Sequence, residues 1–163
     1  MKRVLVLGAG LSATSLINYL LEHSENYDWN IVVGDVDLEL AKRKINGHKN
    51  GTAIKFDVFN ENLRLVETEK SDVVISLLPA RFHHLVAEDC VKTSTNMVTA
   101  SYVSKDMQSL DTAAKQKGVA LLNELGVDPG IDHMSAMKVI DDIRDKGGKL
   151  LLFKSSTGGL VAP

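Results

Sequence analysis

The strongest constraint on this chain is a glycine-containing turn set between an apolar run and an apolar helical pattern near the N-terminus. The apolar run covers residues 4–7, the turn reads Gly-Ala-Gly-Leu-Ser-Ala over residues 8–13, and the helical pattern runs through residues 16–21. A strand, a glycine turn and a helix in this order are the context that a dinucleotide-binding fingerprint requires. We expect the phosphates of a dinucleotide to lie on the free N–H groups at the start of that helix.

Each small residue of the turn has its own mechanical task. Gly8 would form the tight turn, Gly10 would let the backbone come close to a pyrophosphate, and Ala13 would let the helix pack closely on the strand. The predicted cofactor-binding residues of the turn are Gly8, Gly10, Leu11, Ser12 and Ala13.

The next strand–helix unit supplies an acidic residue where a dinucleotide site would use one. Residues 29–33 (WNIVV) indicate a second buried strand, and Asp35 follows at its carboxyl end. The spacing from Gly8 exceeds the ~20 residues typical of the fingerprint, and a polar loop over residues 23–28 accounts for the surplus. A carboxylate there accepts hydrogen bonds from the adenosine ribose and repels a 2′-phosphate, so the sequence favours NAD over NADP.

Two alternatives for this second unit stay open. Asp35 could cap the helix expected over residues 38–45, a task that Asp37 could perform equally well. The basic run over residues 42–44 keeps NADP open as the cofactor, although it also fits the solvated face of that helix.

The composition is that of a soluble globular protein with room for one ordinary domain. The chain has 163 residues, of which 44% are hydrophobic and 25% charged, a normal balance for a folded domain. A net charge of −2 without a basic stripe argues against nucleic acid as a partner. No apolar run reaches the length of a membrane span, and the N-terminus lacks a signal peptide, so a cytoplasmic location is expected.

The chain has one cysteine, Cys90. A single cysteine excludes a disulfide framework within the chain and a cysteine-rich zinc site. Its apolar helical neighbours indicate a buried thiol.

Apolar runs of strand length alternate with helical patterns along the whole chain. Strands are expected over residues 4–7, 29–33, 52–56, 73–78, 96–100, 119–122 and 150–153. Further helices are expected over residues 38–45, 61–69, 82–93 and 105–117, and from residue 132 or 133 to 146. Gly118 would end the helix over residues 105–117. This alternation predicts an α/β fold with a doubly wound, mostly parallel Rossmann-type sheet and helices on both faces. We expect residues 1–163 to form one dinucleotide-binding domain.

Further candidate residues lie where the expected strands end, which is the edge at which such sheets bind ligands. Asp57 could contact the adenine edge or simply form a turn. Leu77, Leu78 and Pro79 would line the pyrophosphate and ribose, unless they only close a strand. Ser101 completes the cofactor-binding candidates.

No metal site is expected. His83 and His84 are adjacent, so they cannot both face one ligand from a helix, and they fit ordinary core and surface histidines. The sequence has no histidine pair at i, i+4 and no cysteine cluster.

The most specific stretches of the sequence lie in its second half. They are NMVTASYVS over residues 96–104, NELGVDPGIDHM over residues 123–134 and GGLVAP over residues 158–163. Together with ISLLP at residues 75–79, they resemble the N-terminal part of saccharopine dehydrogenase of the glutamate-forming type, the saccharopine reductase family. The resemblance covers essentially the whole chain.

The resemblance implies an oxidoreductase of lysine metabolism that uses NAD or NADP. Such enzymes interconvert saccharopine with glutamate and 2-aminoadipate 6-semialdehyde by hydride transfer at a secondary amine carbon. A reaction of this kind needs groups that accept or supply protons. On the matching positions, the resemblance places Tyr102 and Asp128 near the nicotinamide and the reacting amine as catalytic residues. Asp128, which precedes Pro129, could also be a turn residue only. Asp132 and His133 are weaker candidates, because Asp commonly caps a helix.

Two departures from the family pattern affect the expected function. The family usually has Tyr-Cys-Gly-Gly-Leu-Pro-Ala-Pro at its closing motif, where this chain has Thr157 for the cysteine and Val161 for a proline. A thiol role is therefore lost, and a related dehydrogenase that makes carboxylated polyamines stays open as an alternative. Family members also continue into a large substrate domain, so the resemblance implies an N-terminal fragment of a longer enzyme.

The expected partners are a dinucleotide and, in the full-length enzyme, a small amino-acid substrate. Neither nucleic acid nor a membrane is expected, and a homodimer is compatible with the sequence. A non-catalytic domain that senses NAD is the remaining alternative, since a glycine turn with Asp35 would serve it equally well.

Overall fold

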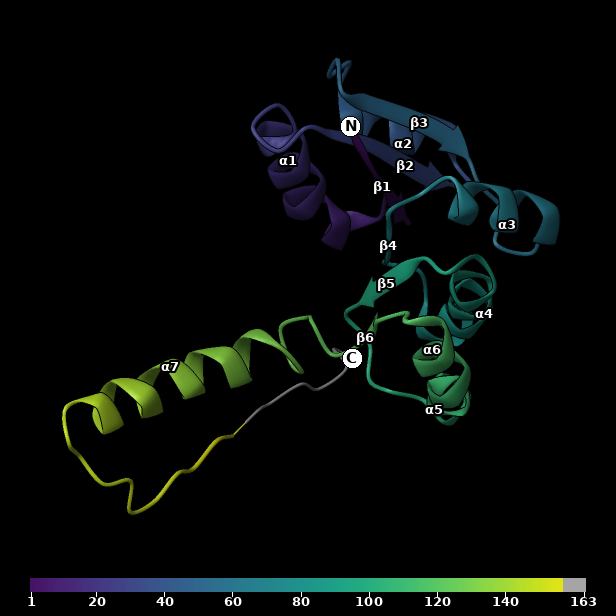
Figure 1. The fold of residues 1–163 in the computed structure, drawn as a ribbon. Helices are drawn as coiled ribbons and strands as arrows, with labels where there is room; N and C mark the ends of the chain where they lie inside the picture. Colours follow the sequence, from purple (N-terminus) through teal and green to yellow (C-terminus); the bar gives the residue numbers. More distant parts are fainter. Residues whose placement is uncertain (157–163) are drawn as a thin grey trace, which may run out of the picture.

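Six parallel strands form one sheet in the computed structural model, which describes residues 1–156 (Figure 1). The strands are β1 Lys2–Leu7, β2 Trp29–Asp35, β3 Gly51–Lys55, β4 Val73–Ser76, β5 Asn96–Thr99 and β6 Leu121–Leu122. Their spatial order is β3-β2-β1-β4-β5-β6. This is the order of dinucleotide-binding folds, in which the order of the strands reverses between β1 and β4. The predicted fold class is confirmed.

Seven α-helices connect or follow these strands. They are α1 Thr14–His23, α2 Leu38–Ile45, α3 Glu61–Glu69, α4 His83–Thr93, α5 Lys105–Ser109, α6 Asp111–Lys117 and α7 Ile131–Asp145, with short 3-10 turns at Leu11–Ala13 and Ala80–Phe82. Within residues 1–156, none of these helices is long and apolar enough to cross a membrane.

The alternation of side chains along β1 divides the core between the two faces of the sheet. Val4 and Val6 pack with apolar residues of α1 and α2 on one face. Leu5 and Leu7 pack with apolar residues of α4 on the other, together with Leu63 of α3. Successive residues of a strand point to opposite faces, so a strand buried on both faces has to be apolar throughout.

Side-chain caps fix where several helices begin. The Asp37 carboxylate accepts hydrogen bonds from the backbone N–H groups of Glu39 at 3.0 Å and Leu40 at 3.1 Å. Asn60 and Ser104 cap α3 and α5 in the same way. Asp37, and not Asp35, therefore caps α2, which answers one of the two questions left open by the sequence. At the far end of α6, Gly118 adopts the left-handed conformation expected of a helix C-terminus.

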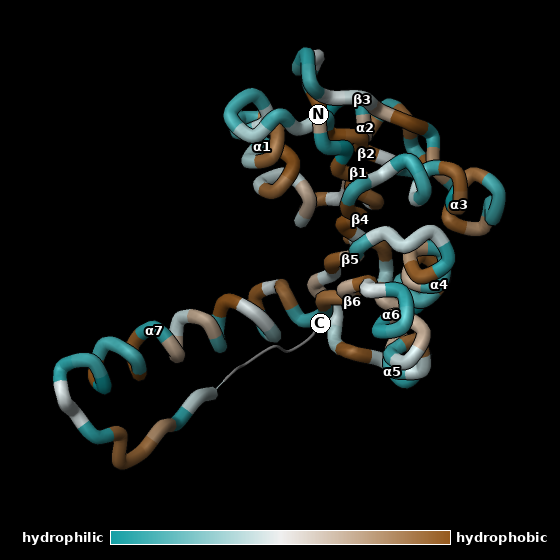
Figure 2. Tube along the Cα trace, viewed as in Figure 1, coloured by the Kyte–Doolittle hydropathy of each residue, from teal (hydrophilic) through white to brown (hydrophobic). Residues whose placement is uncertain are grey.

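Two predicted elements differ from the structure. The helix expected over residues 105–117 is divided into α5 and α6 at Leu110. The strand expected over residues 150–153 does not form, and Leu151 in that run is 86% exposed. Figure 1 shows the reason, because this run follows α7, which projects away from the sheet and brings the run to no strand edge. Figure 2 shows the same run as an apolar segment distant from the apolar interior of the sheet.

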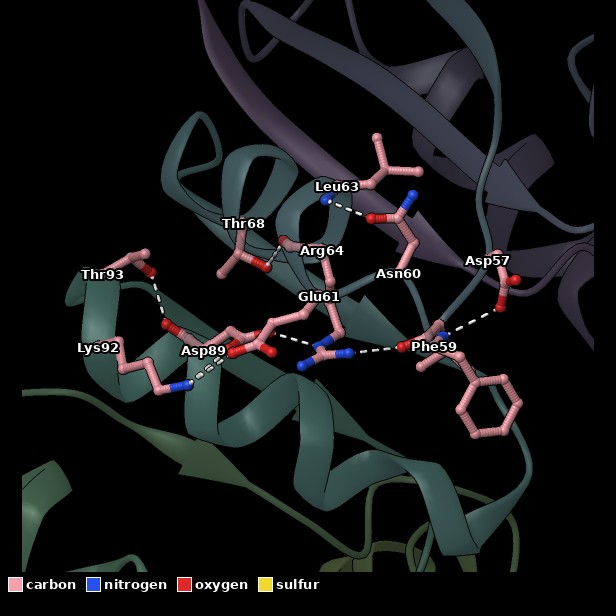
Figure 3. Close-up of polar contacts among 11 residues, drawn as sticks. Asp57, Phe59, Asn60, Glu61, Leu63, Arg64, Thr68, Asp89, Lys92 and Thr93 are labelled. Carbon is pink, nitrogen blue, oxygen red and sulfur yellow. Dashed lines mark hydrogen bonds and ion pairs between the residues drawn. The ribbon is translucent and has the colours of Figure 1, made fainter.

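A buried ion pair holds α3 against α4 (Figure 3). The Arg64 guanidinium donates to the Asp89 carboxylate and to the Val58 carbonyl oxygen, and the two charged side chains are 6% and 0% exposed. Lys92 adds a contact to Asp89 at 3.2 Å. Because buried charges are tolerated only when they are paired and hydrogen-bonded, loss of either partner would leave an uncompensated charge between the two helices.

Cys90 lies in the same helix as Asp89 and is fully buried, as its apolar setting predicted. Burial, with the neighbouring charge of Asp89 as a second cause, raises the pKa of its thiol to about 12. The thiol therefore stays protonated and packs as a small apolar group.

Candidate functional site

The two glycines of the turn differ in whether the fold itself requires glycine. Gly8 has a φ of +100°, and a Cβ atom there would lie 2.9 Å from the Leu77 carbonyl oxygen, so the fold itself requires glycine. Gly10 has an ordinary φ of −62°, and a Cβ atom there would meet nothing within 4 Å. The fold therefore leaves open space above Gly10, where a pyrophosphate would approach the backbone.

The helix that follows the turn begins without a capping side chain. Neither Gly10, which precedes the 3-10 turn, nor Ala13, which precedes α1, makes a side-chain cap hydrogen bond. Leu11 is 96% exposed and Ser12 is also exposed, whereas Ala13 is buried against the sheet as predicted. Helix N-termini carry unsatisfied N–H groups and a partial positive charge, so this segment suits the phosphates of a dinucleotide.

Asp35 ties the glycine turn to the end of β2. One of its carboxylate oxygens accepts a hydrogen bond from the Ala9 backbone N–H at 2.7 Å, and the other accepts one from the Asp37 N–H at 2.9 Å. Each carboxylate oxygen has a second lone pair, so the group can still accept a hydrogen bond from a ribose. The predicted ribose contact stays a prediction, now with Asp35 located directly beside the turn.

The segment after β4 forms the second wall next to the turn. The Leu77 N–H donates to the Leu7 carbonyl at 2.8 Å, and its own carbonyl faces Gly8. Leu77 and Leu78 are half-buried and Pro79 is exposed. The three residues therefore lie at the point between β1 and β4 where such sheets bind their cofactors.

Asp57 follows β3, which is the outermost strand on one side of the sheet. Its carboxylate accepts a hydrogen bond from the Phe59 N–H at 3.0 Å, which is a turn-forming contact. This favours the turn interpretation, and contact with adenine stays a prediction. Phe59 in turn packs edge-on against Phe82 at 5.2 Å between ring centroids, which joins the loops after β3 and β4.

Tyr102 and Asp128 are brought together from separate parts of the chain. The Tyr102 hydroxyl donates to an Asp128 carboxylate oxygen at 3.4 Å. The negative charge of Asp128, then partial desolvation, raises the pKa of the Tyr102 phenol. The charge of Asp128 therefore favours the protonated phenol, which donates its hydrogen bond to that carboxylate. The two segments that carried the family resemblance thus converge, while the catalytic roles stay predictions.

Asp132 and His133 have a local structural task. One Asp132 carboxylate oxygen accepts hydrogen bonds from the Gly130 N–H at 2.8 Å and from His133 Nδ1 at 2.9 Å. The hydrogen bond to Asp132 raises the pKa of His133. These contacts hold the start of α7, but Asp132 is not its cap, because the N-cap residue is Gly130 and no side chain makes a cap hydrogen bond there.

One feature of the site was not predicted from the sequence. His83 is buried, as a core histidine, but it also contacts the hydroxyl groups of Ser76, Thr99 and Ser101 at the ends of β4 and β5. Ser76 and Thr99 are the last residues of β4 and β5. Ser76 also interrupts the apolar run over residues 73–78, and that interruption is the sequence signal that could have revealed the cluster. Among the described residues, no group of three His, Cys, Asp or Glu side chains could hold a metal ion.

The strand order, the glycine turn and the residues at the strand ends define a dinucleotide-binding domain. Residues 4–122 match the family model described as the saccharopine dehydrogenase NADP binding domain. Residues 126–163 match a second model, described as the saccharopine dehydrogenase C-terminal domain. The chain belongs to the saccharopine dehydrogenase family, which confirms the predicted resemblance.

Individual relatives agree with this assignment. A saccharopine dehydrogenase (NADP(+), L-glutamate-forming) of Pyricularia oryzae is 39% identical over 99% of this chain, and the match covers 35% of that protein. An alpha-aminoadipic semialdehyde synthase of Arabidopsis thaliana is 36% identical over 98% of this chain and 17% of its own length. The solved apo saccharopine dehydrogenase (L-Glu forming) of Saccharomyces cerevisiae superimposes with a TM-score of 0.80 at 37% identity, over 92% of this chain and 33% of that chain.

These comparisons bear on the cofactor and on the extent of the chain. The family name specifies NADP, which the sequence kept possible although Asp35 favoured NAD. The chain spans about a third of the length of the Pyricularia oryzae enzyme. Thr157, Val161 and the closing GGLVAP motif lie outside the residues that the structure describes.

The two glycines of the turn should respond differently to substitution. Gly10→Val should leave the unfolding midpoint unchanged, because the fold has space and an ordinary φ there, but should weaken NADPH binding at least about tenfold by blocking the pyrophosphate. Gly8→Ala should lower the unfolding free energy by about 1–3 kcal/mol, because alanine is strained at that φ. Calorimetric titration and urea denaturation measure the two effects. Tight NADPH binding by Gly10→Val would show that the turn serves packing only.

Proposed function

We propose that this chain provides the dinucleotide-binding part of an oxidoreductase that acts on the CH–NH group of saccharopine and yields glutamate and 2-aminoadipate 6-semialdehyde. The observation that carries the proposal is the convergence of the glycine turn, the Leu77–Leu78 wall and the Tyr102–Asp128 pair at the carboxyl ends of neighbouring parallel strands. The names of the relatives, which include L-glutamate-forming saccharopine dehydrogenases, support it.

In this proposal the chain's own groups bind the cofactor and manage protons. The N–H groups that follow Gly10 hold the pyrophosphate, and Asp35 faces the adenosine ribose. A bound nicotinamide dinucleotide would supply hydride acceptance. The protonated phenol of Tyr102 and the carboxylate of Asp128 lie within hydrogen-bond distance of each other, so one can supply and the other accept a proton near the amine and the attacking water.

We further propose that the substrate is enclosed by residues beyond those described here, in a longer enzyme. Support comes from the share of the relatives' length that the match covers, 35% for the Pyricularia oryzae enzyme. Large apolar side chains of α7 are also exposed, among them Ile131, Met134 and Val139. Exposed apolar residues of this size on one helix are typical of a surface that packs against another part of a protein.

The choice between the two dinucleotides should depend on the charge of Asp35. Asp35→Asn keeps an oxygen that can accept from the Ala9 N–H but removes the negative charge. Binding of NADPH should therefore improve relative to NADH by about five- to tenfold, since two charges about 4 Å apart in water interact by roughly 1 kcal/mol. Titration of this chain with each nucleotide, followed by nicotinamide fluorescence, measures the ratio. Asp72→Asn is the matched control, because Asp72 pairs with Lys2 at the amino ends of the strands, away from the glycine turn. An unchanged ratio in Asp35→Asn would exclude Asp35 from the ribose site.

The catalytic part of the proposal is tested in a longer protein that carries this chain together with a substrate domain. Tyr102→Phe and Asp128→Asn should each lower kcat for saccharopine oxidation by about 10²-fold or more, the usual contribution of a proton-transferring group. The unfolding midpoints should stay close to that of the unmodified protein, because both side chains are exposed. Unchanged turnover in both variants would contradict the proposal and favour a dinucleotide-sensing domain.

A further inference from the structure

His83 is the first residue of α4 and is 3% exposed, enclosed between the ends of β4 and β5. Its Nδ1 atom lies 2.8 Å from the Ser76 hydroxyl oxygen. Its Nε2 atom lies 2.9 Å from the Ser101 hydroxyl oxygen and 3.0 Å from that of Thr99. One buried ring therefore contacts hydroxyl groups from both strands next to the candidate site.

The chemistry of these contacts fits a neutral imidazole. A neutral ring has one N–H donor and one acceptor nitrogen, and a hydroxyl group can donate or accept, so both nitrogens can be satisfied at once. Burial lowers the pKa of His83, which keeps the ring uncharged at neutral pH. A buried polar network with every member satisfied is rigid and specifies a single arrangement.

The ring acts on the segment that carries Tyr102. From the interior, His83 holds the Ser101 side chain. From the other side, the Ser101 carbonyl accepts a hydrogen bond from the Glu124 N–H at 3.0 Å, and the Glu124 carboxylate accepts one from the Val103 N–H at 3.2 Å. The residue between these attachments is Tyr102, which extends to Asp128. The direction of the phenol therefore depends on contacts on both sides of its backbone.

The same ring also acts on the opposite wall of the candidate site. Ser76 is the last residue of β4 and directly precedes Leu77 and Leu78, which lie beside the glycine turn. His83 thus joins the segment expected to line the dinucleotide to the segment expected to act on the amine. A buried imidazole needs hydrogen-bond partners in any case, and here those partners come from both strands.

We propose that His83 is a positioning residue, whose neutral ring fixes Ser101 relative to Ser76 and thereby places the Tyr102 phenol against Asp128. The inference rests on the proposed function for its catalytic meaning, since it assigns His83 an effect on the pair expected to manage protons. The geometric part concerns this chain alone and needs neither cofactor nor substrate.

The test is the titration of Tyr102 in this chain, followed by NMR of tyrosine labelled with ¹³C at Cζ. In the unmodified chain the pKa of Tyr102 should lie above the ordinary value, because the negative charge of Asp128 opposes loss of the phenolic proton, with smaller effects of Asp132 and Glu124. Asp128→Asn, the reference variant, should lower it. His83→Ala and Ser101→Ala should lower it as well, because the phenol is no longer held beside Asp128. His83→Gln, whose amide can both donate and accept, should restore most of the shift.

Thr95→Val is the matched control. Thr95 is also a buried hydroxyl residue, but it lies just before β5, at the opposite end of that strand, and bonds to Thr68 and Thr93. The Thr95→Val substitution should lower the unfolding midpoint and leave the pKa of Tyr102 unchanged. If His83→Ala and Ser101→Ala both kept the raised pKa of Tyr102, the positioning role would be wrong. Ser101→Ala keeps the test decisive even if His83→Ala does not fold.

Turnover separates this inference from the proposed function. In a longer protein that oxidises saccharopine, His83→Ala should lower kcat about tenfold or more, since small misplacements of catalytic groups have effects of this order, and His83→Gln should recover most of it. If Tyr102 lost its raised pKa in His83→Ala while kcat stayed intact, the positioning role would stand and the catalytic role of the Tyr102–Asp128 pair would be overturned.

Discussion

The close approach of the glycine turn to the chain after β4 is the contact on which the rest of the structure depends. β1 pairs in parallel with both β2 and β4, so three strands end together at the turn. Gly8 donates to the Gly34 carbonyl at 2.8 Å on one side and lies against the Leu77 carbonyl on the other. Because a Cβ atom at Gly8 would lie 2.9 Å from that carbonyl oxygen, a side chain there would force the turn or the segment after β4 to move.

Local patterns in the sequence predicted the sheet and much of the site. Continuous apolar runs identified β1 and β4, because a strand buried on both faces has no polar side to alternate with. The run over residues 150–153 shows the limit of this reasoning. Its apolar character is real, but a strand also needs a neighbouring edge to pair with, and the position of α7 takes the run away from the sheet.

The contacts between distant residues could not be predicted in the same way. The hydrogen bond from the Ala9 N–H to Asp35 depends on how β1 and β2 are aligned, and periodicity carries no information about that register. The environment of His83 depends on β4 and β5 ending at the same level. Tyr102 and Asp128 were identified by resemblance and by their position after expected strands, but no local pattern predicted that they contact each other, because they lie in separate loops after β5 and β6.

We infer that a dinucleotide binds between the glycine turn and the segment after β4. This claim can be tested by backbone amide NMR of the chain during a titration with NADPH. We expect the largest shift changes at residues 8–13, at residues 35–37 and at Leu77 and Leu78. Changes confined to another surface, such as the groove beside β6 lined by Val103, Met107 and Asn123, would contradict the claim.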